Sequence, residues 1–135
     1  MNTFDLKIIT PEKLFFEGKA VQLIARTESG NIGIMADHAP YVANLVPYSL
    51  KIKTDSNQEF RVAAIAGGFI KVFKNDVVIT THAIEWAEDI DIMRAKKAKE
   101  QAEKLLQDHN SDKEFVRAEQ KLKRAVNRIG ISEKY

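Results

Sequence analysis

The chain has 135 residues and a net charge of +2, and 44% of its residues are hydrophobic and 30% charged. The length fits one domain, or a small domain with an appendage. The high charge excludes a membrane-embedded protein, and the longest apolar run, residues 62–70, is far shorter than the roughly 20 residues of a bilayer span. The absence of cysteine excludes disulfides and thiolate metal sites and favours a cytosolic location, and no signal peptide is apparent at the N-terminus.

Up to about residue 84 the chain alternates apolar and polar residues with a period of two, as in residues 4–8, 50–53 and 70–72. Such alternation marks strands with one buried face. Turn-forming residues separate these strands at positions 28–31, 55–57 and 74–76. The pattern predicts an N-terminal antiparallel β-sandwich of about eight to ten short strands over residues 1–86. Within it, Gly67 and Gly68 predict a bulge or a close approach of two backbones.

Beyond residue 88 the period changes to 3.6, which predicts two amphipathic helices. A polar break at residues 107–110 separates them, and Ser111 to Glu114 form a capping box that would begin the second helix. A short connection between amphipathic helices predicts an antiparallel two-helix hairpin over residues 87–135. The apolar faces are expected to comprise Ala95, Ala98, Ala102 and Leu105 in the first helix, and Phe115, Ala118, Leu122, Ala125 and Ile129 in the second.

Alanine dominates the predicted interface between the helices. It allows close approach but contributes little buried area, because each buried CH₂ group is worth only about 0.8 kcal/mol. We therefore expect a hairpin of marginal stability that is suited to opening or detaching.

The charge order at the start of the first helix changes from acidic to basic: Glu88, Asp89 and Asp91 precede Arg94. A helix dipole favours this order, so Asp91 is expected to satisfy unpaired amides at the helix start. A ligand role for Asp91 is indicated only if it acts together with Arg94, Arg124 and Arg128.

Charge is distributed unevenly along the chain, since residues 1–89 carry 9 basic and 11 acidic groups and residues 90–135 carry 12 and 8. Part of this excess of basic groups forms a stripe along one face of the second helix, with spacings of four, three and four residues. Its members are Arg117, Lys121, Arg124 and Arg128. This stripe is either a solvated face or an anion site. An antiparallel hairpin would bring Arg94, Arg124 and Arg128 together at its base, where a polyphosphate would neutralise them.

Signatures of catalysis are missing, since the sequence has no HExxH, GxSxG or phosphate-binding glycine motif. The three histidines, His38, His82 and His109, are scattered and do not have the spacing of metal ligands. We expect neither an enzyme nor a metal site.

Several motifs, in their order and spacing, resemble those of one family throughout the chain: the epsilon subunit of bacterial F-type ATP synthases. The motifs are Gly30-Asn31-Ile32-Gly33-Ile34 with Asp37-His38-Ala39-Pro40, Ala66-Gly67-Gly68-Phe69, Ile90-Asp91-Ile92-Met93-Arg94-Ala95 and Leu122-Lys123-Arg124-Ala125-Val126-Asn127-Arg128-Ile129.

The resemblance implies a non-catalytic rotor subunit of the central stalk, peripheral at the cytoplasmic face of the cell membrane and held there only through the complex. The sandwich would bind the gamma subunit and the ring of c subunits, with Asn31 and His38 in the contact. Asn31 replaces an acidic residue common in that family. The hairpin would inhibit ATP hydrolysis when it extends into the alpha/beta head through the basic face of Arg117, Lys121, Arg124 and Arg128.

In some members of that family the hairpin also binds ATP, so the resemblance implies ATP as a regulatory ligand. It implies no required cofactor. By likeness, Glu85, Ile90, Asp91 and Ala95 would contact the adenine side, and Arg94, Arg124 and Arg128 the phosphates. Gln101 stands where those members have another arginine, so phosphate binding is expected to be weaker here.

Two other roles of the basic stripe remain open from the residues alone. It could bind nucleic acid, although Glu100, Glu103, Glu114 and Glu119 alternate with it and Phe115 is the only aromatic residue of the second helix. It could instead bind an acidic protein surface, which is compatible with inhibition of the alpha/beta head.

Overall fold

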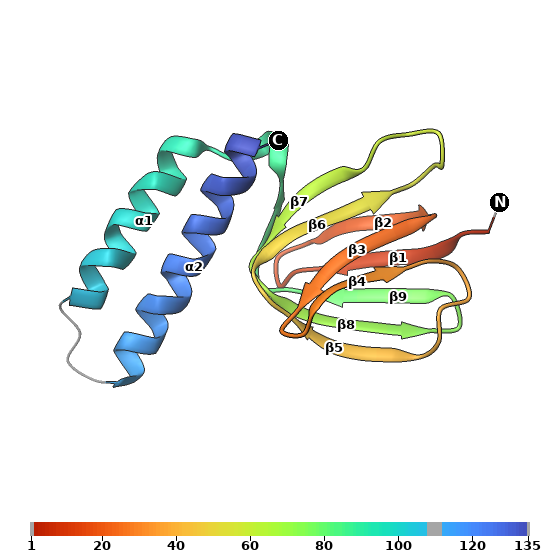
Figure 1. The fold of residues 1–135 in the computed structure, drawn as a ribbon, viewed down its shortest axis with the longest axis horizontal. Helices are drawn as coiled ribbons and strands as arrows, with labels where there is room; N and C mark the ends of the chain where they lie inside the picture. Colours follow the sequence, from red (N-terminus) through yellow and green to blue (C-terminus); the bar gives the residue numbers. More distant parts are fainter. Residues whose placement is uncertain (1, 108–111, 135) are drawn as a thin grey trace. The chain divides into compact units, whose positions relative to one another are not determined.

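The computed structural model describes residues 2–107 and 112–134. The chain divides into two compact units, Met1–Trp86 and Ala87–Tyr135, the first built of strands and the second of helices (Figure 1). The predicted fold class, a sandwich-like β unit followed by a two-helix hairpin, is confirmed.

Ten strands form the first unit, and most of them are five or six residues long. In chain order they are β1 (Phe4–Ile9), β2 (Leu14–Ala20), β3 (Gln22–Thr27), β4 (Gly30–Ile34), β5 (Tyr41–Leu45), β6 (Tyr48–Lys53), β7 (Arg61–Ile65), β8 (Gly68–Phe73), β9 (Asp76–Thr80) and β10 (Ile84–Trp86). Hydrogen bonding links them in the order β10-β7-β6-β3-β5-β8-β9-β1-β2, and β4 pairs with β3 beside this path.

One pairing differs from the predicted antiparallel pattern: β1 pairs with β9 in parallel. The pairing joins two antiparallel pairs, β1 with β2 and β8 with β9, whose sequences lie far apart. Alternation of apolar residues identifies strands but carries no information on such long-range partners, which explains the error.

Side chains from most strands fill a single core. Its largest fully buried members, which include Phe4, Leu23, Leu50 and Ile79, lie at alternate positions of their strands. The period-two pattern therefore locates the buried face correctly. The core extends to Trp86, the last residue of the unit, whose ring contacts that of Phe15 at a centroid distance of 4.7 Å.

Gly67 and Gly68 occupy the close backbone approach that the sequence predicts. Both have positive φ, at 103° and 138°. A Cβ atom added at Gly68 would clash with the carbonyl oxygen of Thr80 and lie 3.1 Å from the Cα of Thr81. A Cβ atom at Gly67 would lie 3.1 Å from the carbonyl oxygen of Leu45. Because glycine has no Cβ atom, these two residues allow the start of β8 to lie close to the backbone of Leu45, Thr80 and Thr81.

The second unit consists of a short 3₁₀ helix, η1 (Ala87–Asp89), and the helices α1 (Ile92–Gln107) and α2 (Asp112–Lys134), which form an antiparallel hairpin (Figure 1). Four alanines are buried in it: Ala95 and Ala102 in α1, and Ala118 and Ala125 in α2. Ala95 and Ala125 lie at nearly equal distances along their helices from the connection between α1 and α2. Ala102 and Ala118 lie closer to the connection, again at nearly equal distances. Each helix therefore places an alanine level with an alanine of the other.

Leu105 does not belong to the apolar face of α1, which corrects the predicted face. It is 47% exposed, whereas Leu106 is half-buried. At 3.6 residues per turn, Leu106 follows Ala95 by about three full turns and Leu105 is about 80° off that line. Phe115 is also exposed, at 38%, near the start of α2. Ser111 of the predicted capping box lies outside the described residues.

Replacing Gly68 by alanine is expected to destabilise the sandwich by about 2–4 kcal/mol, because the new Cβ atom meets backbone and the φ angle is unfavourable for any residue with a side chain. Gly33→Ala is the matched control, since an added Cβ atom there meets nothing within 4 Å. Urea denaturation of the two variants measures the difference. Equal midpoints for both would show that the approach at Gly68 has no energetic consequence.

Candidate functional site

Asp91 caps the first helix of the hairpin. Its carboxylate Oδ1 accepts a hydrogen bond from the backbone N–H of Arg94 at 3.1 Å, and its carbonyl accepts from the N–H of Ala95 at 3.0 Å. This is the geometry of an N-cap residue, so the predicted structural role of Asp91 is confirmed. The charge order predicts Glu88 and Asp89 in the first turn of α1 as well, and this is wrong. Both residues lie before the cap, in η1.

An open hollow of about 590 Å³ lies against the first turns of α1. It is lined by Asp91, Met93, Arg94, Lys96, Lys97 and Glu100. Three basic and two acidic side chains therefore surround it, and Met93 is 73% exposed. Neither Arg124 nor Arg128 is among the lining residues. The hollow provides a positive surface beside an N-cap, where backbone amides favour anions.

The antiparallel pairing nevertheless places the other two predicted phosphate ligands at the same end of the hairpin. Arg94 and Arg124 lie at nearly equal distances along their helices from the connection between α1 and α2. Arg124 is therefore level with Arg94, and Arg128 lies about one turn further along α2. Arg128 already has an interaction partner. Their use as phosphate ligands stays a prediction.

Burial divides the basic stripe of α2 into two halves. Arg117 and Lys121 are exposed, whereas Arg124 and Arg128 are half-buried. The exposed half lies towards the start of α2, and the half-buried pair lies beside the start of α1. The two halves therefore differ in how accessible their charged groups are.

The remaining residues predicted to contact adenine differ in their accessibility. Ala95 is 0% exposed and packs within the hairpin, so its side chain is covered in this arrangement. Ile90 is half-buried between η1 and α1, and its N–H donates to the carbonyl of Ala87 at 3.3 Å. Glu85 lies in β10, paired with Ala64 of β7, and has an interaction partner. Gln101 is exposed on α1.

The two residues predicted to contact other subunits lie in and after β4. Asn31 is exposed in β4, opposite Arg26 of β3. His38 is half-buried in the loop between β4 and β5, where its Nδ1 lies 2.7 Å from the carbonyl oxygen of Ala39. Its ring meets the ring of Tyr41 edge-on, at a centroid distance of 5.9 Å.

An exposed apolar surface lies next to this loop on strands β5 and β8, and we call it the outer apolar face. It consists of Val42, Phe69 and Phe73, which are 58%, 41% and 49% exposed. Lys71 lies between the two phenylalanines along β8 and pairs with Val42 of β5. This face was not among the features predicted from the sequence. Its signal was the alternation of Phe69, Lys71 and Phe73 with the buried Ile70 and Val72.

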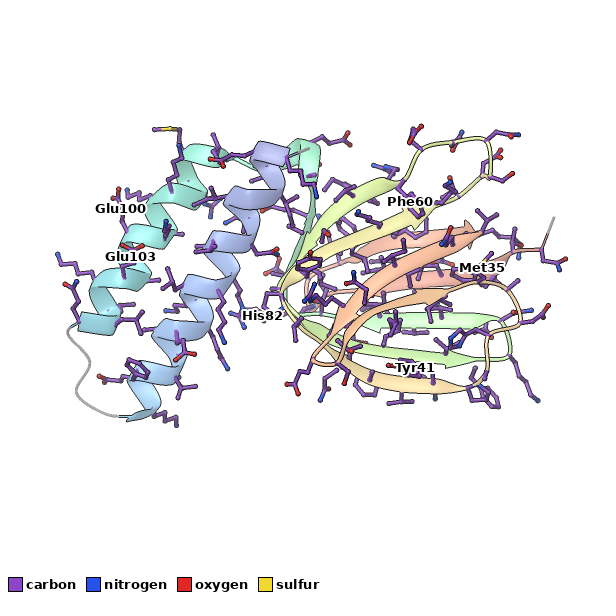
Figure 2. All side chains as sticks on the ribbon, viewed as in Figure 1. Met35, Tyr41, Phe60, His82, Glu100 and Glu103 are labelled. Carbon is purple, nitrogen blue, oxygen red and sulfur yellow. The ribbon has the colours of Figure 1, made fainter. Side chains whose placement is uncertain are left out.

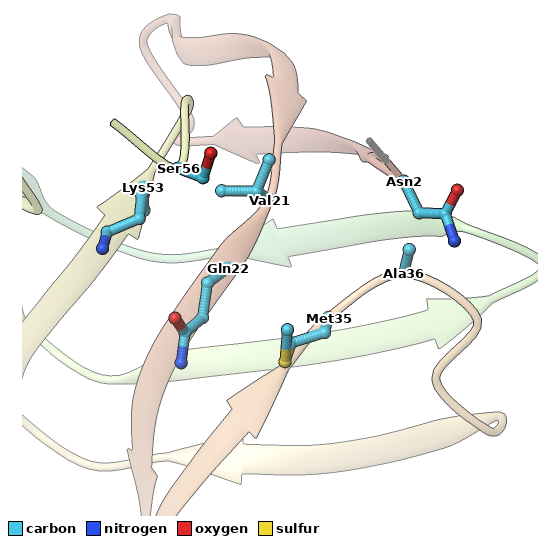
Figure 3. Close-up of a pocket in the computed structure, with 7 residues that line it drawn as sticks. All are labelled: Asn2, Val21, Gln22, Met35, Ala36, Lys53 and Ser56. Atoms are coloured by element: carbon cyan, nitrogen blue, oxygen red, sulfur yellow. The ribbon is translucent and has the colours of Figure 1, made fainter. Parts of the chain in front are cut away.

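A second hollow, of about 370 Å³, opens beside the end of β4 (Figure 3). Val21, Met35 and Ala36 supply apolar surface, and four polar side chains surround it: Asn2, Gln22, Lys53 and Ser56. Met35 is 59% exposed (Figure 2). Met35 and Ala36 belong to the loop that carries His38, so the hollow lies beside that loop.

Over their described residues, neither α1 nor α2 is both long enough and apolar enough to cross a bilayer. Within residues 2–107 and 112–134, no three His, Asp or Glu side chains are grouped so that they could hold a metal ion.

Two family models together match almost the whole chain. The model of the ATP synthase delta/epsilon chain β-sandwich domain matches residues 3–87, and that of the delta/epsilon chain long α-helix domain matches residues 88–133. The chain is 51% identical to the ATP synthase epsilon chain of Ruminococcus albus over 99% of both chains. It is 42% identical to that of Caldanaerobacter subterraneus, over 98% of this chain and 96% of the relative.

Solved structures share the fold at low sequence identity. A chain of the Euglena gracilis mitochondrial ATP synthase, in a structure of OSCP, F1 and the c-ring, is 23% identical with a TM-score of 0.76, over 91% of this chain and 77% of that one. A chain of the Tetrahymena thermophila mitochondrial ATP synthase, from its central stalk and c-ring, is 18% identical with a TM-score of 0.66, over 95% of both chains.

A sandwich followed by a helical hairpin, matched along its length, defines a stalk-type accessory subunit without a catalytic centre of its own. The chain belongs to the delta/epsilon chain family of ATP synthases, and its nearly full-length relatives are epsilon chains. The chain is therefore not itself an enzyme.

Asp91→Ala is expected to destabilise the start of α1 by about 1 kcal/mol, because the amide of Arg94 loses its acceptor. Asp91→Asn is the control, since asparagine caps a helix about as well without the charge. Hydrogen exchange of the first-turn amides measures both effects. Equal protection in the alanine variant and the unmodified chain would contradict a stabilising cap.

Proposed function

We propose that the chain is the epsilon subunit of the rotor, in the central stalk of a bacterial F-type ATP synthase, peripheral at the cytoplasmic face of the membrane. The β-sandwich binds the gamma subunit and the c ring, and the hairpin regulates ATP hydrolysis. The observation that carries the proposal is the match to epsilon chains over 99% of the sequence at 51% identity, which includes both units.

The surface of the sandwich supports a role in binding protein partners. A soluble monomer rarely exposes several large apolar residues side by side without a function for them. The outer apolar face has two aromatic residues, a type enriched in protein interfaces, with one lysine between them. Val42 of this face follows His38 closely in the sequence, so the face and the loop can contribute to one contact surface.

The packing of the hairpin supports a role as a mobile regulator. Among the described residues after Trp86, the buried hydrophobic side chains are four alanines and Ile131. Alanine contributes roughly 2 kcal/mol less than leucine per fully buried side chain, on the basis of about 0.8 kcal/mol per CH₂ group. Helices joined in this way separate at low cost, and their exposed basic residues, Arg117 and Lys121, then suit acidic surface of the alpha/beta head.

Deleting residues 87–135 is expected to abolish inhibition of ATP hydrolysis while leaving affinity for the gamma subunit unchanged. The measurement is the ATPase rate of the host enzyme reconstituted with full-length or shortened chain, together with gamma binding by each. A shortened chain that folds but does not bind gamma would refute the role given to the sandwich. Inhibition that persists after the deletion would refute the role given to the hairpin.

ATP is the regulatory ligand that we propose for the base of the hairpin. The level positions of Arg94 and Arg124 and the capped start of α1 support the proposal, and Gln101 argues for modest affinity. A ligand at about 100 times its dissociation constant would favour the state that binds it by roughly 2.7 kcal/mol, which is comparable to what a weak helix interface supplies.

Calorimetric titration with Mg-ATP is expected to show binding that weakens about tenfold to hundredfold in Arg94→Ala and Arg128→Ala, the range for losing a hydrogen bond to a charged group. Lys121→Ala is the control, because Lys121 is exposed and lies away from the base of the hairpin. Absence of heat at millimolar ATP, or equal affinity in all variants, would refute the proposal.

The nucleic-acid alternative is not favoured by the family comparisons. A gel-shift assay at moderate salt that showed tight, salt-sensitive binding would revive it.

A further inference from the structure

Two turns that lie far apart in the sequence are joined by a reciprocal pair of hydrogen bonds. The backbone N–H of Asp37 donates to Oδ1 of Asn75 at 2.6 Å, and Nδ2 of Asn75 donates to Oδ1 of Asp37 at 3.2 Å. Asp37 lies in the β4–β5 loop and Asn75 in the β8–β9 turn, at the same end of the sandwich (Figure 1). We call this pair the clasp.

The backbone at both residues has the left-handed conformation, with φ of 64° at Asp37 and 63° at Asn75. Asparagine and aspartate tolerate this conformation better than other residues with a side chain. The turn of Asn75 is itself fixed to the sheet, because its carbonyl accepts a hydrogen bond from the N–H of Asp5 at 2.8 Å. The clasp therefore connects the β4–β5 loop to a turn that is anchored on β1.

The clasped loop carries His38 in the position next to Asp37. The N–H of His38 donates to the carbonyl of Met35 at 3.3 Å. The ring of His38 contacts the carbonyl oxygen of Ala39 and the ring of Tyr41. Loop residues 35–40 otherwise connect two strands that do not pair with each other. Without the clasp, the loop would lose its connection to the β8–β9 turn.

We propose that Asp37 and Asn75 are positioning residues, which hold the β4–β5 loop in one conformation and so present His38 and the adjacent surface to the rotor partners. This inference rests on the proposed function. A loop that is ordered before binding does not lose conformational freedom on binding, which raises affinity without a contact to the partner. Phe73 of the outer apolar face lies just before the turn that contains Asn75, so the clasp also fixes the loop relative to that face.

Asn75→Gly is the most selective test, because glycine keeps the left-handed backbone and removes both hydrogen bonds. Lys74→Gly is the matched control, since Lys74 lies in the same turn with φ of 49° and takes no part in the clasp. Asp37→Asn should behave like the unmodified chain, because its amide oxygen still accepts from Asn75. We expect Asn75→Gly to bind the host gamma subunit with its c ring about threefold to thirtyfold more weakly, as for one or two ordinary hydrogen bonds.

NMR order parameters of the β4–β5 loop amides provide a readout that needs no partner. They should fall in Asn75→Gly and stay unchanged in Lys74→Gly and Asp37→Asn. Unchanged loop order in Asn75→Gly, or binding equal to that of Lys74→Gly, would overturn the inference. If the unmodified chain binds neither gamma nor the c ring, the proposed function fails, and positioning for those partners fails with it, whereas the loop order still shows whether the clasp holds.

Discussion

The burial of small alanine side chains in the two helices is the constraint on which the behaviour of the hairpin depends. Ala95 and Ala102 of α1 lie level with Ala125 and Ala118 of α2, one heptad apart in each helix. Small side chains let the helices pack closely, but they remove little apolar surface from water. The sandwich, in contrast, buries phenylalanine, leucine and isoleucine side chains from most of its strands. One chain thus combines a firmly packed unit with a lightly packed one.

This contrast fits the roles that we propose for the two units. A unit proposed to bind the rotor partners benefits from a rigid core, and Gly67, Gly68 and the clasp of Asp37 with Asn75 contribute to that rigidity at particular points. A regulatory element needs two arrangements of similar free energy, which a large apolar interface would prevent. The split of the basic stripe into an exposed and a half-buried half is compatible with the proposal that the two halves bind different partners.

The sequence was sufficient to predict the fold class, the alternating core positions, the close approach at Gly68 and the cap at Asp91, because each of these follows from local spacing or local backbone chemistry. The parallel pairing of β1 with β9 and the Asp37–Asn75 clasp could not be predicted in this way, since both join segments that are distant in the sequence. Leu105 was placed on the wrong face because two adjacent leucines leave the helical phase ambiguous by one residue. The outer apolar face was overlooked because an exposed phenylalanine in a strand resembles a buried one in the sequence.

Native-state hydrogen exchange on the isolated chain, resolved by residue, measures whether the hairpin opens more easily than the sandwich. Light packing of the hairpin predicts that amides in the middle of α1 and α2 exchange through an opening of lower free energy than amides of β1, β8 and β9, which exchange only on global unfolding. Equal free energies of exchange in the helices and in these strands would contradict it, because the hairpin would then be held as firmly as the sandwich.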